Sequence, residues 1–397
     1  MSQLHQLQID ARSYAAEGQY LSSYISLREA AAEAKRFGDF RSTMICLINA
    51  YQQGGIANIK AVERFRLLLE IRALMHSHPD QVPVGLNINF RGGIQIWIFE
   101  HTASHTPRRD LLEQGLGDIR DAHISDQFSS RRRIHSMRGE WTEARHFSEQ
   151  AWSNFLKPYV VPDCCSMLHK TVYALDVFAD ALVLEDREAA KQWLETAAKV
   201  LETHNCRNCK RNYLRSRVEF ALAVHEPIAA VRAELAAARD QDHTIEAAYY
   251  TDYLSARVDL LDPDNGDPCA STHPARVEFC RRPSAGSLSV TERYGHATAV
   301  LDYRLAALRY ATGLPPMDDY WPAPIGSSAP PPSPIVVQPR YDTVEVRRRL
   351  AKARHAANKA MRAAKTLDDM LECDWRQLAV KGRIERIEAI SSALTPP

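Results

Sequence analysis

The strongest constraint on the fold is a long succession of helix-periodic segments joined by very short connections. Apolar residues recur at helical spacing from residue 109 to residue 261. Helices joined this tightly lie side by side as antiparallel neighbours. The sequence therefore predicts an all-α fold of antiparallel helical hairpins. The predicted helices cover 109–121, 123–138, 141–155, 164–185, 187–204, 210–225, 227–240 and 243–261.

The same periodicity extends to 3–53, 59–76 and 291–312. The composition agrees, because glycine is scarce (16 of 397 residues) and the 45% hydrophobic content excludes wholesale disorder. A chain of 397 residues is too long for one ordinary core, so it forms either several domains or one extended array. The formal net charge of +1 gives no global field that would attract nucleic acid or a membrane.

The stretch 84–99 breaks the helical pattern. Leu86, Ile88 and Phe90 alternate with polar residues before Gly92-Gly93, and the alternation resumes after the glycine pair. A period of two on both sides of a glycine pair predicts a short β-hairpin. A helix that starts near Arg91 is the competing interpretation, favoured by the helical surroundings.

Two later segments are poor in helical signal. Residues 262–290 carry scattered proline and glycine and are predicted to be loop. The acidic run Asp262–Asp267 within this loop does not have glycine and glutamate at the positions that a calcium-binding loop requires, so we interpret it as an acidic turn. Residues 313–340 are proline-rich and form either an extended linker or a strap on the surface. The tail 341–397 is predicted to be a basic helical hairpin that breaks near Thr366-Leu367.

Several of the predicted turns carry a Gly-polar-aromatic pattern followed by small residues. The clearest copy of this pattern is Gly139-Glu140-Trp141, followed by Ala144, Phe147 and Ala151. A second copy is Gly18-Gln19-Tyr20 with Leu27 and Ala30, although Ser23 stands where alanine is usual. Two weaker copies are Asp186-Arg187 with Ala190, Leu194 and Ala197, which lacks the turn glycine, and Glu226-Pro227 with Ala230 and Ala237. The pattern resembles that of tetratricopeptide repeats. Ala144, Ala190 and Ala230 lie 46 and 40 residues apart, against a family period of about 34, so the array would be degenerate.

The resemblance implies an α-solenoid over residues 1–312. Stacked helical hairpins expose a long concave face that binds a peptide or protein segment, and such proteins are usually adaptors or sensors rather than catalysts. The alternative is an irregular helical domain whose alanines merely pack.

The cysteines offer one candidate metal site. Cys206 and Cys209 form a C-x-x-C pair, and the hairpin 164–204 would return the chain to the end where Cys164 and Cys165 begin. His169 and His204 are alternative ligands. Four such ligands suit a tetrahedral structural zinc, whereas a redox pair or ordinary buried thiols are the competing interpretations.

Basic residues are concentrated at the start of the tail. The two acidic residues between 341 and 365 are Asp342 and Glu345, and no aromatic residue is interleaved for base stacking. This helix either contacts phosphates or an acidic partner, or presents a solvated face. Its basic residues are Arg347, Arg348, Arg349, Lys352, Arg354, Lys359, Arg362 and Lys365.

The motif search gives no positive sign of an enzyme. The chain has no G-x-S-x-G elbow, no phosphate-binding loop and no dinucleotide fingerprint. It also lacks a secretory signal and a long apolar run, which predicts a cytoplasmic protein without a membrane partner. The leading hypothesis is therefore an intracellular scaffold, adaptor or regulatory subunit that binds a protein or peptide. A nucleic-acid-associated accessory subunit is the alternative, followed by a zinc-dependent enzyme.

Overall fold

A computed structural model describes residues 3–57, 59–82, 124–155, 164–203, 207–240, 245–280, 290–315 and 335–394. Within these ranges the regular structure is helical and contains no strand, which confirms the all-α prediction. The β-hairpin predicted at 84–99 and its competing helix lie outside the described residues. The helices are α1 (Gln3–Ala16), α2 (Tyr20–Arg36), α3 (Phe40–Ile56), α4 (Ala61–Ser77), α7 (Ile124–Arg138), α8 (Trp141–Phe155), α9 (Cys164–Val183), α10 (Arg187–Glu202), α11 (Arg207–Ala223), α12 (Ile228–Arg239), α13 (Ile245–Leu261), α14 (Ala275–Cys280), α15 (Val290–Ala311), α16 (Thr343–Leu371) and α17 (Trp375–Leu394), with short 3₁₀ turns at Pro79–Gln81 and Pro263–Asn265.

The tight turns between helices share one backbone device. Gly18, Gly38 and Gly139 have φ of 79°, 72° and 77°, and the next residue donates its N–H to the carbonyl five positions earlier. This arrangement closes the end of a helix and requires the left-handed conformation that glycine adopts most easily. Glu185, His225 and Glu372 occupy the same place with φ of 58°, 57° and 53°. The turn predicted to lack its glycine at Asp186 is therefore built the same way, with glutamate at the left-handed position.

The weakest repeat copy has a different register from the one its sequence indicates. Ala230 is exposed and Ala237 half-buried, whereas Val231, Leu235 and Ala238 are buried. Pro227 remains outside α12 with an extended ψ of 135°, so the helix starts one residue later than α10 does after its own turn. The buried positions of α12 therefore lie one residue later in the sequence than the repeat pattern indicates.

Two other predicted boundaries were wrong. The expected break near Thr366-Leu367 does not exist, because Leu367 is buried in the core and α16 continues to a left-handed Glu372. The region 262–290 was predicted to be loop, but Ala275–Cys280 forms the short helix α14, whose Ala275 and Phe279 pack into the core formed with α13 and α15.

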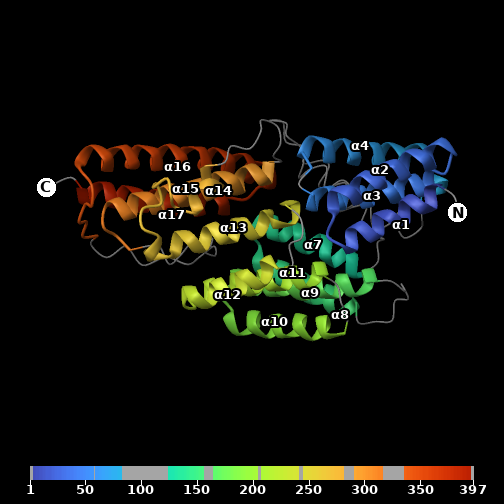
Figure 1. Cartoon of the computed structure of the whole chain (residues 1–397), viewed down its shortest axis with the longest axis horizontal. Helices are drawn as coiled ribbons and strands as arrows, with labels where there is room; N and C mark the ends of the chain where they lie inside the picture. The colour runs from blue at the N-terminus through green and yellow to red at the C-terminus, as the bar shows by residue number, and fades with distance from the viewer. Residues whose placement is uncertain are drawn as a thin grey trace.

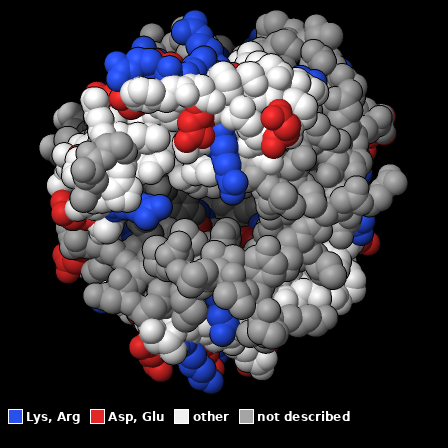
Figure 2. Space-filling view, turned by 90° about the vertical axis from the view of Figure 1, so that its right-hand side faces the viewer, with Lys and Arg blue, Asp and Glu red and all other residues white. Residues whose placement is uncertain are grey.

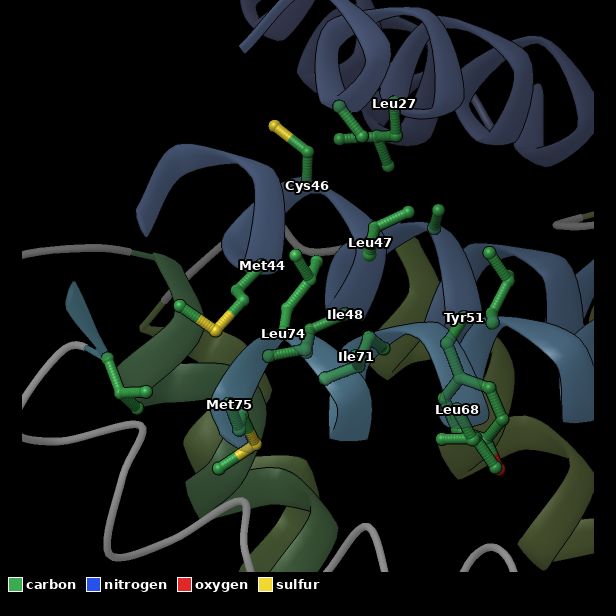
Figure 3. Packing of buried hydrophobic residues seen from close by; sticks show 14 of the residues in the cluster. Leu27, Met44, Cys46, Leu47, Ile48, Tyr51, Leu68, Ile71, Leu74 and Met75 are labelled. Carbon is green, nitrogen blue, oxygen red and sulfur yellow. The ribbon is translucent and has the colours of Figure 1, made fainter. Parts of the chain in front are cut away.

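Successive helices pack against one another along the chain. Figure 1 shows α1–α4 at one end of the molecule, α14–α17 at the other, and α7–α12 along one side, with α13 between them. In the core of the first group, shown in Figure 3, the apolar side chains of α3 lie between those of α2 and α4. This core includes Leu27, Met44, Leu47, Ile48, Leu68, Ile71 and Met75.

The end of the chain returns to the N-terminal helices. Leu367, Met370 and Leu371 of α16 belong to the same core as α1–α4, together with Ile134 and Met137 of α7. The C-terminal end of α16 therefore packs against α7 and the N-terminal helices. Figure 2 views the molecule from the side of its N-terminal helices, where basic and acidic side chains both lie on the described part of the surface.

The last part of the proline-rich segment lies against the end of α15. The N–H groups of Gln338 and Arg340 donate to the carbonyls of Thr312 (2.9 Å) and Ala311 (2.9 Å). Residues 335–340 therefore form a strap, while 316–334 lie outside the described residues.

Among the helices of the described ranges, none combines the length and hydropathy that a bilayer-spanning helix needs.

Candidate functional site

A groove between α9 and α11 is the best candidate binding site among the described residues. Its volume is about 250 Å³, and both signs of charge face it beside two apolar side chains. Because neither helix contains the whole set, packing of α9 against α11 creates the groove. We call it the α9–α11 groove; it is lined by Val172, Leu175, Asp176, Asn212, Arg215, Ser216 and Glu219.

A buried ion-pair cluster fixes the α9 wall. Arg132 of α7 lies 2.9 Å from the Asp176 carboxylate and donates Nε and Nη2 to Asp180, at 2.9 and 2.8 Å. Ser148 also donates to Asp180 (3.0 Å), whose side chain is only 1% exposed. Burial disfavours the charged form of Arg132, but the two carboxylates outweigh it and raise the pKa of Arg132.

Asp176 differs from Asp180 because it also faces the groove. Burial raises the pKa of Asp176, the Arg132 charge opposes this rise, and the Asp180 charge adds to it. Its carboxylate is thus held beside one guanidinium while its other side lines the α9–α11 groove. A cationic or hydrogen-bonding group entering the groove would stabilise the ionised form of Asp176.

The opposite wall is anchored by α13. Arg215 of α11 is buried, and its Nε donates to the hydroxyl of Thr251 (3.0 Å). Burial raises the pKa of Tyr253 on α13, and the negative charge of Glu219, one turn further along α11, adds to this rise. The hydrogen bond to Thr251 holds the arginine of the groove against α13.

Beyond Tyr253 the charges continue into the C-terminal helices. Arg383 of α17 forms a buried pair with Asp302 of α15, with distances of 2.6 and 3.2 Å. Burial opposes the charge of Arg383, yet Asp302 outweighs it and raises the pKa of Arg383. Burial likewise raises the pKa of Tyr294, which lies beside this pair.

Sequence reasoning did not find this site. The groove residues match no short motif, because they come from two helices and the partners of their charged side chains come from α7 and α13. One weak signal was available: Asp176 and Asp180 are carboxylates among the apolar residues Ala174, Val177, Phe178 and Ala181 of a predicted helix. A carboxylate on a buried helix is normally paired or functional.

A second groove, of about 470 Å³, lies between α2 and α4. Its charged lining includes Arg28, Glu63 and Arg66, all exposed to solvent. Glu70 on its edge pairs with Lys35 at 3.1 Å. Exposed, screened charges bind a ligand weakly, so this larger groove is a poorer candidate than the α9–α11 groove.

The predicted zinc ligands lie mostly outside the described residues. Cys164 and Cys165 begin α9, but their side chains and that of His169 are not described, and His204 and Cys206 fall between α10 and α11. Cys209 is buried in the first turn of α11. Within the described part of the chain, no group of three or more His, Cys, Asp or Glu side chains could hold a metal ion. The structural zinc therefore stays a prediction.

The structure divides the eight basic residues of the tail. Arg349 is 5% exposed and makes two 2.7 Å hydrogen bonds to Asp267 and one to Glu345, so it faces the interior. Arg348 is exposed and also pairs with Glu345, and Arg354 pairs with Glu388 on α17. The remaining five are exposed: Arg347, Lys352, Lys359, Arg362 and Lys365.

Asp267, in the acidic turn, thus has a structural role. Burial opposes its ionisation, but hydrogen bonds from Arg349, Tyr341 and the Cys269 N–H outweigh it and lower the pKa of Asp267. The Asp267–Arg349 pair joins the turn after α13 to α16.

The sequence matches no protein-family model and no curated protein sequence. Comparison with known proteins therefore assigns no role to the α9–α11 groove or to the basic residues of α16.

Proposed function

We propose that this chain is an intracellular adaptor that binds an extended segment of a partner protein in the α9–α11 groove. In this proposal the helices form a degenerate, tetratricopeptide-like solenoid, and the groove belongs to its concave face. The role is binding without catalysis.

The single observation that carries the proposal is the groove itself. Its volume of about 250 Å³ lies below the roughly 300–1,000 Å³ typical of small-molecule sites. That size suits one or two side chains of an extended peptide. Val172 and Leu175 can pack on an apolar side chain, while Asp176 and Asn212 can bond to polar groups beside it.

The repeated left-handed turns support the solenoid part of the proposal. Gly18, Gly139, Glu185 and His225 end the first helix of the pairs α1–α2, α7–α8, α9–α10 and α11–α12, and Gly38 and Glu372 end α2 and α16 in the same way. Equivalent turns give equivalent crossing of each pair, which is how stacked repeats generate a continuous binding face.

Affinity purification of the full-length protein from its own cells, followed by mass spectrometry, tests the proposal. The variant Ser216→Tyr fills the groove, and Glu195→Tyr makes the same addition on the exposed surface of α10. We expect one partner to co-purify in stoichiometric amount with the native protein and with Glu195→Tyr, and to be lost with Ser216→Tyr. Equal recovery by all three proteins, or no partner at all, would contradict the proposal.

A further inference from the structure

The outer side of α16 carries a row of exposed cations. Arg347, Lys352, Lys359, Arg362 and Lys365 are all exposed. The 18 residue-to-residue steps from Arg347 to Lys365 correspond to about 27 Å of helix at 1.5 Å per residue. At 100° per residue the five positions fall within one side of the helix, opposite its buried alanines. We call these five residues the α16 stripe.

The cations of the α16 stripe are not neutralised by neighbouring acids. Among the described residues, no carboxylate lies within 4.0 Å of any of the five, whereas Arg348, Arg349 and Arg354 on the same helix are all paired. Glu345, Asp267 and Glu388 are paired with these other arginines, and Asp369, one turn after Lys365 on the same helix, makes no ion pair with any of the five. The stripe keeps a local positive charge although the whole chain has a formal net charge of only +1.

The other side of α16 is already occupied. Ala353, Ala357, Ala360 and Ala364 are buried in the core formed with α15 and α17. Figure 1 shows α16 along one edge of the molecule with these two helices on one side of it only. The apolar face is therefore unavailable for insertion into a lipid surface, and a partner meets charge alone.

The chemistry of the stripe favours a regular polyanion. Long basic side chains recur along one helix, with no Phe, Tyr or Trp among them for stacking on unpaired bases. A duplex presents phosphates at regular intervals along its backbone, about one charge per 1.7 Å of axis. We propose that the α16 stripe binds the phosphate backbone of a nucleic-acid duplex without reading its sequence.

Counterion release gives the proposal a quantitative test. Each neutralised phosphate contributes about −0.9 to the slope of log K against log salt, so five cations predict a slope of about −4.5. Anisotropy of a short labelled DNA duplex and of an RNA duplex, titrated with the full chain between about 50 and 200 mM salt, measures this slope. Binding of either duplex with that slope supports the proposal.

Two matched double variants locate the surface. Lys359→Gln with Arg362→Gln removes two cations of the stripe, and Lys191→Gln with Lys199→Gln removes two exposed cations of α10. The first variant should weaken duplex binding at least about tenfold at low salt and reduce the slope by about 1.8, and the second should change neither. Circular dichroism and thermal unfolding confirm that both variants stay folded.

Several results would overturn the proposal. They are undetectable duplex binding at low salt, equal binding by the two double variants, or competition by polyglutamate or anionic phosphatidylserine vesicles as strong as that of the duplex at equal charge. The last result would assign the stripe to an acidic protein or a lipid surface. Because the stripe and the α9–α11 groove lie on different helices, this test and that of the proposed function fail independently.

Discussion

The guanidinium of Arg376 donates a 2.6 Å hydrogen bond to the backbone carbonyl of Met137, a residue 239 positions earlier in the chain. The indole of Trp375 donates to the same carbonyl at 3.1 Å and meets Trp141 edge to face. The turn between α16 and α17 is thereby attached to the turn between α7 and α8. This attachment closes the helical array.

Breaking this attachment should destabilise the whole molecule. Arg376 is 3% exposed and pairs at 3.0 Å with Asp368, which is fully buried. Arg376→Met leaves that carboxylate without its cation, and we expect a loss of about 3 kcal/mol in the free energy of unfolding. Urea unfolding measures it. Arg354→Met breaks an exposed pair with Glu388 and should cost less than about 1 kcal/mol. Equal losses of unfolding free energy in the two variants would show that the buried pair contributes no more to stability than the exposed pair.

The left-handed turn residues predict two stabilising substitutions. Glu185 and His225 hold φ of 58° and 57°, a region that costs a residue with a Cβ about 1 kcal/mol relative to glycine. Glu185→Gly and His225→Gly should each raise the unfolding free energy by about 0.5 kcal/mol, after the greater flexibility of glycine in the unfolded chain is deducted. Glu195→Gly, in the middle of α10, should instead lower it by about 1 kcal/mol. Destabilisation by all three glycines would refute the strain at these turns.

Acid should weaken the ion pairs that Glu345 makes with Arg348 and Arg349 within α16. Hydrogen bonds from Arg348 and Arg349 lower the pKa of Glu345 from its usual 4.5 to about 2. The folded state therefore holds the ionised form more strongly than the unfolded state does. This stabilisation is complete above pH 4.5 and is lost as the pH falls towards 2.

The variant Glu345→Gln isolates this effect. At neutral pH it should be less stable than the native protein by about 1 kcal/mol, and the difference should shrink as the pH falls from 4.5 to 2, where half of the native side chains are protonated. Unfolding midpoints across this range provide the measurement. A difference that stays constant with pH would disprove the linkage.

The core of the N-terminal helices should depend on α3. Leu47 is 2% exposed and lies in the core shown in Figure 3, whereas Leu69 of α4 is 41% exposed. Leu47→Ala removes fully buried atoms and should cost about 2–5 kcal/mol. Leu69→Ala should cost about 1 kcal/mol or less. Thermal unfolding distinguishes the two, and a similar loss at both sites would mean that the buried contacts of α3 do not dominate.

Helix content and most turns were predictable from the sequence because they depend on local patterns. The glycines at 18 and 139 announced their turns, but the equivalent roles of Glu185 and His225 did not follow from residue type, since neither residue favours positive φ. The buried positions of α12 lie one residue later than the sequence pattern indicates. The spacing of the alanines does not show whether Pro227 begins the helix or precedes it, as it does in the structure.

The binding surfaces depend on contacts between distant segments. Arg349 looked like one of eight similar basic residues, and only its pairing with Asp267, 82 positions away, separates it from the α16 stripe. The α9–α11 groove joins residues that are unremarkable within either helix. Periodicity identifies which residues face inward, but it does not say which helices meet.

Site-specific photo-crosslinking tests the central claim most directly. A photoreactive amino acid at position 216, inside the α9–α11 groove, is compared with the same residue at position 195 on the exposed side of α10, with both full-length proteins expressed in their own cells. The account predicts one dominant covalent adduct to a protein partner from position 216 and none from position 195. Adducts of equal yield from the two positions, or none from position 216, would contradict it.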